Sequence, residues 1–335
     1  MMNKYIIGID IGGTKIAVLA ASANGKILKK TKFSTTIHKE SRQSICLIID
    51  RINDVLRQLR ASKRQIAGIG VCAPGPVDPD AVGMPASPNL PGWKGLKLKG
   101  NLKKEFKVPV VVGNDANAAA LAVKCFGEGK KEKNLIYLTV STGVGGGIIV
   151  NNHLVLGAGF CAGEVGHMAI VDNGPKCGCG KFGCLEALAS GTAIAKMATV
   201  ALMNKKNVLK KYGLCFTSQE TQKFRKRAAR YEKITAKEVK ELASKGDRVC
   251  ARILVQAGTY LGMGIANLMN ILNPSLIALG GSVLIGAPLL IASMRRTVRK
   301  KSWAAAYQSC VVKRTLLGGS VNDLGAIALY KSIQT

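Results

Sequence analysis

Residues 134–150 read NLIYLTVSTGVGGGIIV, an apolar run that ends in a turn of hydroxyl and glycine residues and continues as a second apolar run. The same order occurs at residues 5–21, YIIGIDIGGTKIAVLAA. Each stretch predicts two strands joined by a glycine turn. Because one chain contains two such hairpins, we expect a duplicated α/β unit whose turns face one phosphate chain from opposite sides.

Both turns carry groups that can hold phosphate. Glycines let backbone N–H groups approach phosphate oxygens, Thr14 and Lys15 add donors, and Asp10 could hold a hydrated Mg²⁺. A Gly-Gly hairpin alone is a common turn, and the first turn is not a Walker A loop, so the prediction depends on the repetition. A later glycine pair ends a strand and could lie against adenine or ribose. The predicted nucleotide-binding residues are Asp10, Gly12, Gly13, Thr14, Lys15, Ser141, Thr142, Gly143, Gly145, Gly146, Gly280 and Gly281.

Four further residues are candidate ligand contacts. Asn114 and Asp115 follow an apolar strand and precede an alanine-rich helix, which would hold their side chains on a rigid mount. An aspartate at such a place can equally be only a helix N-cap. Gly75, in the turn APGPVD, could bring the backbone against a ligand. Asn89, in SPNLPGW at residues 87–93, is explained as well by ordinary turn chemistry.

Residues 162–186, AGEVGHMAIVDNGPKCGCGKFGCLE, place a histidine and three thiols in the pattern H-x9-C-x-C-x4-C. These four N/S donors have the number and chemistry of a closed structural zinc site, which leaves Glu164 and Glu186 to bind something polar. The alternatives are inert buried cysteines beside a core histidine, or a disulfide, which a C-x-C pair is too cramped to form easily. The clustering favours zinc. The predicted ligands are His167, Cys177, Cys179 and Cys184.

The bulk properties indicate a soluble globular protein. The 335 residues, of which 47% are hydrophobic and 20% charged, suffice for two domains. The start shows no signal peptide, so cytoplasm is the expected location. Residues 253–294 carry no charge and could span a membrane by length. Polar and glycine interruptions favour a buried helix and strand instead, and Gly258, Gly262 and Ala266, four apart, indicate close helix packing.

The net charge of +30 comes from 49 Lys and Arg against 19 Asp and Glu, with dense runs at 97–107, 223–230 and 294–301. Such a field attracts anionic partners. The runs lack the interleaved aromatic residues of a nucleic-acid face, so we expect a solvated basic surface, with neither a specific nucleic acid nor a membrane as partner.

Together these motifs resemble the ROK family of sugar kinases and regulators, and within it the bacterial-type glucokinases. Nearly the whole chain takes part, through IGIDIGGTK, GVCAPGPVD, SPNLPGW, VVVGNDANAAAL, LTVSTGVGGGII, GAGFCAGEVGHM, CGCGKFGCLEA, ITAKEV and NPSLIALGG. The resemblance implies an α/β, two-domain, actin-like and hexokinase-like ATPase fold with duplicated ribonuclease H-like domains. Residues 1–115 would form the small domain, to which a helix at about 323–335 returns, and residues 116–322 the large domain with the zinc loop.

The resemblance also implies a function: ATP-dependent transfer of a phosphoryl group to the 6-hydroxyl of glucose or a related hexose, with Mg²⁺, a structural Zn²⁺ and a homodimer or higher homo-oligomer. Asp115 would be the catalytic base. The zinc-binding His167 would also touch the sugar. The implied sugar contacts are Asn89, Asn114, Asp115, Glu164, His167 and Glu186, with Gly75 beside them.

This chain departs from the family pattern at three places. Ser141 stands where glycine is usual, Lys124 stands where an acid is common, and GGSVLIGA replaces a more glycine-rich turn. Polyphosphate therefore stays open as a donor, as do N-acetylglucosamine, N-acetylmannosamine and fructose as substrates, although SPNLPGW looks more like glucokinases. A sugar-responsive repressor is the alternative of another class; the nine residues before Asp10 leave no room for its helix-turn-helix domain, so we expect a kinase.

Overall fold

The computed structural model describes residues 4–35, 41–78, 80, 83–84, 90 and 92–334. The contacts divide the chain into two compact units. Unit 1 comprises residues 1–137, 147–163 and 315–335, and unit 2 comprises residues 138–146 and 164–314. The domain boundaries expected from the sequence stay a prediction.

The first sheet, in unit 1, has the strand order β3-β2-β1-β4-β5. The first three strands form an antiparallel meander, whose first hairpin the sequence predicts. Strand β4 pairs in parallel with β1, and β5 pairs in parallel with β4. The elements of this unit are β1 (Tyr5–Ile11), β2 (Lys15–Ala21), β3 (Ile27–Ser34), α1 (Ser41–Gln58), β4 (Ile66–Ala73), α2 (Leu98–Phe106), β5 (Val110–Asn114), α3 (Asp115–Phe126) and α12 (Val321–Lys331).

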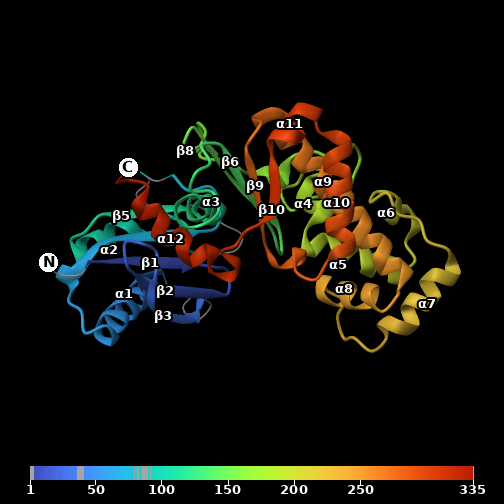
Figure 1. Ribbon diagram of the computed structural model, residues 1–335. Helices are drawn as coiled ribbons and strands as arrows, with labels where there is room; N and C mark the ends of the chain where they lie inside the picture. Colours follow the sequence, from blue (N-terminus) through green and yellow to red (C-terminus); the bar gives the residue numbers. More distant parts are fainter. Residues whose placement is uncertain are drawn as a thin grey trace. The chain divides into compact units, whose positions relative to one another are not determined.

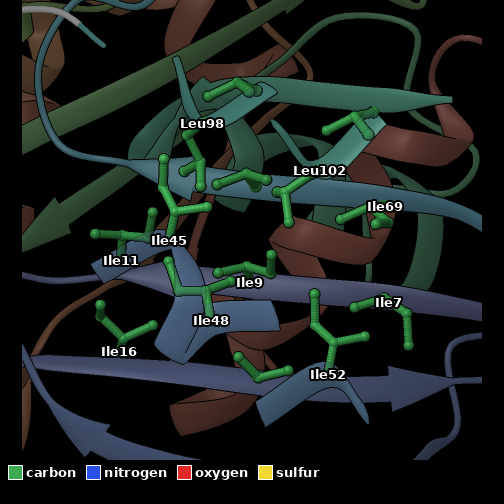
Figure 2. Close-up of a cluster of buried hydrophobic side chains, with 14 of the residues drawn as sticks. Ile7, Ile9, Ile11, Ile16, Ile45, Ile48, Ile52, Ile69, Leu98 and Leu102 are labelled. Atoms are coloured by element: carbon green, nitrogen blue, oxygen red, sulfur yellow. The ribbon is translucent and has the colours of Figure 1, made fainter. Parts of the chain in front are cut away.

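Alternation along β1 sends its side chains to opposite faces of the sheet. Figure 2 shows Ile7, Ile9 and Ile11 packed among side chains from α1 and α2, and all of them are buried. The opposite face receives α12, where a Cβ on Gly70 would lie 1.8 Å from the backbone oxygen of Ala326. A side chain at position 70 would push this helix off the sheet, so the glycine permits the close contact.

The second sheet has the order β10-β9-β6-β7-β8 (Figure 1). Its strands are β6 (Leu135–Val140), β7 (Val144–Val150), β8 (His153–Leu154), β9 (Leu276–Gly280) and β10 (Val311–Arg314). The unit boundary cuts β6 and β7 in their middle. The helices of unit 2 are α4 (Leu185–Ala189), α5 (Gly191–Leu202), α6 (Lys206–Lys210), α7 (Ser218–Ala228), α8 (Ala236–Ser244), α9 (Arg248–Leu272), α10 (Pro288–Lys301) and α11 (Ala304–Ser309).

Helix α9 is long and apolar enough to cross a membrane, but 67% of its most apolar window is buried inside the protein. It packs on α10, α8, α4 and α5. A Cβ on Gly258 would lie 2.2 Å from the backbone oxygen of Leu290, and one on Gly262 would lie 2.7 Å from that of Met294. The two glycines therefore let α9 and α10 approach closely, as their spacing predicts, and α9 is a core helix.

Candidate functional site

The sequence-predicted site residues fall into two sets, one in each unit, and Asn89 lies outside the described residues. In unit 1, three predicted positions meet at the carboxyl edge of the first sheet. Asp10 lies near the end of β1, Gly75 follows β4, and Asn114 ends β5. Because β1, β4 and β5 are parallel, their carboxyl ends share one edge, where ligands bind in open α/β sheets.

Asn114 is the N-cap of α3. Its side-chain oxygen accepts hydrogen bonds from the backbone N–H groups of Ala116 (2.9 Å) and Asn117 (3.0 Å). Its amide nitrogen donates to the backbone oxygen of Gly75 at 3.0 Å, which ties the strand end to the APGPVD turn. Asp115 is therefore not the cap but the first residue of the helix, where the positive end of the helix dipole stabilises a carboxylate.

Asp10 is a carboxyl group held in an unfavourable environment. Burial, together with the nearby carboxylates of Asp323 and Asp115, raises the pKa of Asp10 to about 6, and the positive charges of Lys30 and Lys32 act in the opposite direction. Asp323, which no sequence motif singled out, lies in the first turn of α12 and forms an ion pair with Lys30 on β3. The one signal of Asp323 in the sequence is that it is the single acidic residue of a mostly apolar helix.

The first glycine turn joins β1 to β2. The backbone N–H of Gly12 donates to the oxygen of Lys15 at 2.9 Å, and Gly13, Thr14 and Lys15 are exposed. Thr35, just after β3, supports this turn twice: its backbone N–H donates to Thr14 O at 3.0 Å, and its hydroxyl donates to Gly12 O at 2.7 Å. No feature of the sequence indicates this role of Thr35.

The second glycine turn, in unit 2, is held from two places, the start of α5 and the residue Ser282 after β9. The oxygen of Ser141 accepts a hydrogen bond from Gly191 N at 2.7 Å, and the oxygen of Thr142 accepts one from the hydroxyl of Thr192 at 2.9 Å. Ser282 N donates to the Ser141 hydroxyl at 3.2 Å. Gly191 and Thr192 begin α5, and the Ser-Gly-Thr start of that helix was a signal that the sequence analysis did not use.

The predicted glycine pair 280–281 lies against this same turn. Gly280 ends β9 and Gly281 has a φ of +99°, which favours glycine. A Cβ on Gly281 would lie 2.2 Å from the oxygen of Val140. Gly145 and Gly146 lie within β7.

Glu186 connects the second turn to the cysteine region. Its Oε2 accepts a hydrogen bond from Val144 N at 3.0 Å, and its Oε1 lies 3.9 Å from the sulfur of Cys177. A Cβ on Gly143 would lie 2.3 Å from Oε2, so this carboxylate can occupy its place only beside a glycine.

The four predicted metal ligands converge. One ligand atom each from His167, Cys177, Cys179 and Cys184 lies within 4.8 Å of all the others. The Nδ1 of His167 is 3.6 Å from the sulfur of Cys177, and the sulfurs of Cys179 and Cys184 are 3.7 Å apart. Tetrahedral zinc, with Zn–S near 2.3 Å and Zn–N near 2.05 Å, places two sulfurs about 3.8 Å apart and a sulfur and a nitrogen about 3.5 Å apart. The donor set therefore fits zinc.

The remaining ring nitrogen of His167 faces away from the thiols. Its Nε2 lies 3.8 Å from Oε2 of Glu164, three residues earlier. Both side chains are partly exposed, at 38% and 35%. A histidine whose Nδ1 joins the thiols therefore presents its second nitrogen and a neighbouring carboxylate to solvent, an arrangement able to bind hydroxyl groups.

Comparison with known proteins identifies the relatives of this chain. A family model described as ROK family matches residues 6–333. The chain is 33% identical to a glucokinase from Halalkalibacterium halodurans, over 98% of this chain and 94% of that protein. It is 31% identical to a xylose repressor from Caldicellulosiruptor bescii, over 98% of this chain and 78% of the repressor.

Solved structures give the same result. The ROK hexokinase from Thermus thermophilus has a TM-score of 0.79 and 29% identity, with 98% of this chain and 99% of that one covered. A ROK family glucokinase from Streptomyces griseus in complex with glucose and AMPPNP has a TM-score of 0.71 and 29% identity, with 99% and 100% covered. The fold is the predicted actin-like, hexokinase-like ATPase fold. The chain belongs to the ROK family.

Proposed function

We propose that the chain is an ATP-dependent glucokinase that phosphorylates the 6-hydroxyl of glucose. The proposal rests on two sets of residues that occur in one chain. The first is the carboxylate of Asp115 at the start of α3, near Asp10. The second is the pair of His167 and Glu164 at the zinc-fitting cluster. A sugar kinase needs a base for the alcohol proton and polar groups for the hydroxyls. The similarity to glucokinases supports glucose as the substrate.

Asp115 is the proposed base. Its carboxylate accepts the proton of the sugar 6-hydroxyl while that oxygen forms a bond to the γ-phosphorus of ATP. The bond between this phosphorus and the β–γ bridging oxygen breaks, and ADP leaves with the electron pair. The backbone N–H of Ala116 donates a hydrogen bond to Asp115 Oδ1 at 2.8 Å, and the bonds of Asn114 fix the strand end that carries this carboxylate.

Glu164, His167 and Glu186 are the proposed hydroxyl ligands, with Asn114, Asn89 and Gly75. The side-chain oxygen of Asn114 already accepts two hydrogen bonds, so its contribution would be an amide N–H. A site of this kind discriminates strongly, since an analogue lacking one hydroxyl leaves polar groups unpaired and can lose as much as ~10⁴-fold in kcat/KM.

The two glycine turns are the proposed phosphate contacts, and the pair at 280–281 the proposed adenine or ribose contact. Exposed Gly13, Thr14 and Lys15 offer donors in unit 1. The carboxyl group of Asp10 fits a hydrated Mg²⁺, because its raised pKa reflects burial and, after that, the nearby carboxylates of Asp323 and Asp115, whose negative charge a cation would offset. Bound Mg²⁺ would neutralise the charge of the phosphates.

Zinc is the proposed metal of the cysteine cluster. Four protein ligands fill a tetrahedral shell, so the metal would have a structural role. Holding His167 Nδ1 would fix the ring so that Nε2 and Glu164 keep their orientation toward a sugar. In this way the cysteines would contribute to sugar affinity without touching the reacting atoms.

The test is a coupled assay of ADP or phosphorylated-sugar formation across glucose, mannose, fructose, N-acetylglucosamine and N-acetylmannosamine, with ATP and with polyphosphate as donors. The proposal expects the largest kcat/KM for glucose with ATP. A larger value for an N-acetylated sugar would refute the substrate, and a larger value with polyphosphate would refute the donor.

A sugar-responsive repressor is the second candidate, favoured by the similarity to a xylose repressor and by the net charge of +30. It predicts sugar binding without turnover. Calorimetric binding of xylose or glucose, together with no phosphorylation of any sugar in the panel, would support the repressor over the kinase.

A further inference from the structure

One face of unit 2 combines positive charge with exposed aromatic rings. From Arg248 to Asn322 the chain contains no Asp or Glu. Within this segment α10, α11 and β10 lie together (Figure 1) and expose seven cations, Arg295, Arg296, Arg299, Lys300, Lys301, Lys313 and Arg314. Among the residues that the structure describes, none of the seven forms an ion pair. Positive charge therefore accumulates here without local compensation.

Two exposed aromatic residues lie in the same segment. Trp303, which links α10 to α11, is 74% exposed, and Tyr307 on α11 is 38% exposed. The backbone around Trp303 is fixed, because its N–H donates to Asn270 Oδ1 at 2.8 Å and its oxygen accepts from Tyr307 N at 2.9 Å. The basic runs lack interleaved aromatic residues in the sequence, but in the folded protein Trp303 and Tyr307 are exposed close to one of these runs.

A cavity of about 330 Å³ opens on this face. Its polar lining comes from Arg295, Tyr307 and Gln308, and its apolar lining includes Met294, Val298 and Val312. This volume is at the lower end of the range of small-ligand pockets, about 300–1,000 Å³. This cavity suits a flat, polar ring that has a negatively charged group attached nearby. It offers such a ligand a cation, a phenol, an amide and an apolar floor.

We propose that this α10–β10 surface, formed by the seven cations with Trp303 and Tyr307, binds single-stranded nucleic acid. The cations contact phosphates, the aromatic rings stack on bases, and the cavity takes one base. A second copy of this chain fits the surface poorly, because a two-fold interface would set seven cations against seven. Paired bases of a duplex cannot offer their faces to Trp303.

The charge component is tested with a labelled oligouridylate of about 12 nucleotides and fluorescence anisotropy. Affinity should fall steeply between about 50 and 200 mM salt. The double variant R295A/R299A should reduce the slope of log affinity against log salt by about 1.4, since each phosphate contact on a single strand contributes about 0.7. The control K223A/K226A removes equal charge from the exposed face of α7 and should leave the slope unchanged.

The stacking component is tested at Trp303. The chain has two tryptophans, and Trp93 is buried, so quenching of tryptophan fluorescence by the oligonucleotide would report Trp303. Trp303→Ala should weaken binding roughly 5- to 150-fold, the range for loss of one stacked base. Trp303→Phe should keep most of the affinity and lose the quenching. Inorganic polyphosphate, which has no bases, should bind the parent and Trp303→Ala equally.

Several results would overturn the proposal. They are no anisotropy change at about 50 mM salt, an equal loss in the α7 control, unchanged affinity of Trp303→Ala, or equal affinity for a duplex of the same length. Sedimentation of the free protein gives one more such result. If the parent is an oligomer and Trp303→Ala dissociates it, this surface is an interface between copies of the chain.

Discussion

The two glycine turns have similar sequences but different supports. The turn at residues 12–14 receives two hydrogen bonds from Thr35, and Gly13, Thr14 and the following Lys15 are exposed. The turn at residues 141–143 is held by α5, by Ser282 after β9, and through Val144 by the carboxylate of Glu186. One turn is a simple hairpin, whereas the other is joined to the region that carries the zinc-fitting cluster.

This difference suggests a division of labour between the units. Unit 1 combines its turn with Asp10, Asp115 and Asp323, carboxyl groups that are able to hold protons and cations. Unit 2 combines its turn with Glu164, His167 and Glu186, groups suited to binding hydroxyls. If the proposed function is correct, changes in unit 1 should affect turnover, and changes around the cysteines should affect sugar affinity. Measurements of kcat and KM can separate the two.

The largest effect is expected for Asp115→Asn. The amide keeps the size of the side chain but cannot take the alcohol proton, so kcat should fall by at least ~10²-fold. The glucose Kd, measured by calorimetry, should change little. Near-parental turnover of this variant would show that Asp115 is not the catalytic base, and the proposed assignment of turnover to unit 1 would be wrong.

The second effect is expected for Cys179→Ser. Removing one of four donors should lower the zinc content and the melting temperature, and raise KM for glucose about 10- to 100-fold, the scale for disturbing the surroundings of a site. The expected fall in kcat is smaller, because the proposed metal would not touch the reacting atoms. Cys215→Ser, at an exposed cysteine of unit 2, is the control and should match the parent. Metal analysis that finds no zinc in the parent would contradict the prediction.

These residues also show how far sequence reasoning extends. The hairpins, the buried helix α9 and the H-x9-C-x-C-x4-C cluster were predictable because each is a local pattern of period, glycine or spacing. The supports were not, because they join distant positions: Thr35 to Gly12, Glu186 to Val144, Ser282 to Ser141 and Lys30 to Asp323. Such pairs depend on register and packing, and no local pattern records them. The roles of the individual site residues stay predictions.

The third effect compares the two turns directly. An alanine Cβ at Gly143 would meet Glu186 Oε2 at 2.3 Å, whereas one at Gly12 would meet only Lys15 O at 3.1 Å. Gly143→Ala should displace the carboxylate, break its bond to Val144 and cost about 1–3 kcal/mol in the free energy of unfolding, with a rise in KM. Gly12→Ala should cost less in urea denaturation. Equal losses in the free energy of unfolding for the two variants would mean that the bond of Glu186 does not make the second turn more sensitive to a side chain than the first.

The smallest effect concerns Asp10 and the pH dependence of stability. Burial raises its pKa from 3.8 to about 6, so between these pH values the folded protein keeps a proton that the unfolded chain has released. Stability from this group therefore falls as pH rises through that window, and the penalty is complete above pH 6.

Asp10→Asn cannot ionise, so it should be more stable than the parent by about 1–2 kcal/mol above pH 6, with no gain below pH 4. Urea denaturation across this range measures the difference. Asp50→Asn, at an exposed position of α1, removes the same formal charge and should show no such step. If Asp10→Asn is less stable than the parent above pH 6, a positively charged partner stabilises the Asp10 carboxylate by more than burial destabilises it. The carboxyl edge of unit 1 would then lack the excess of negative charge that favours binding of a cation.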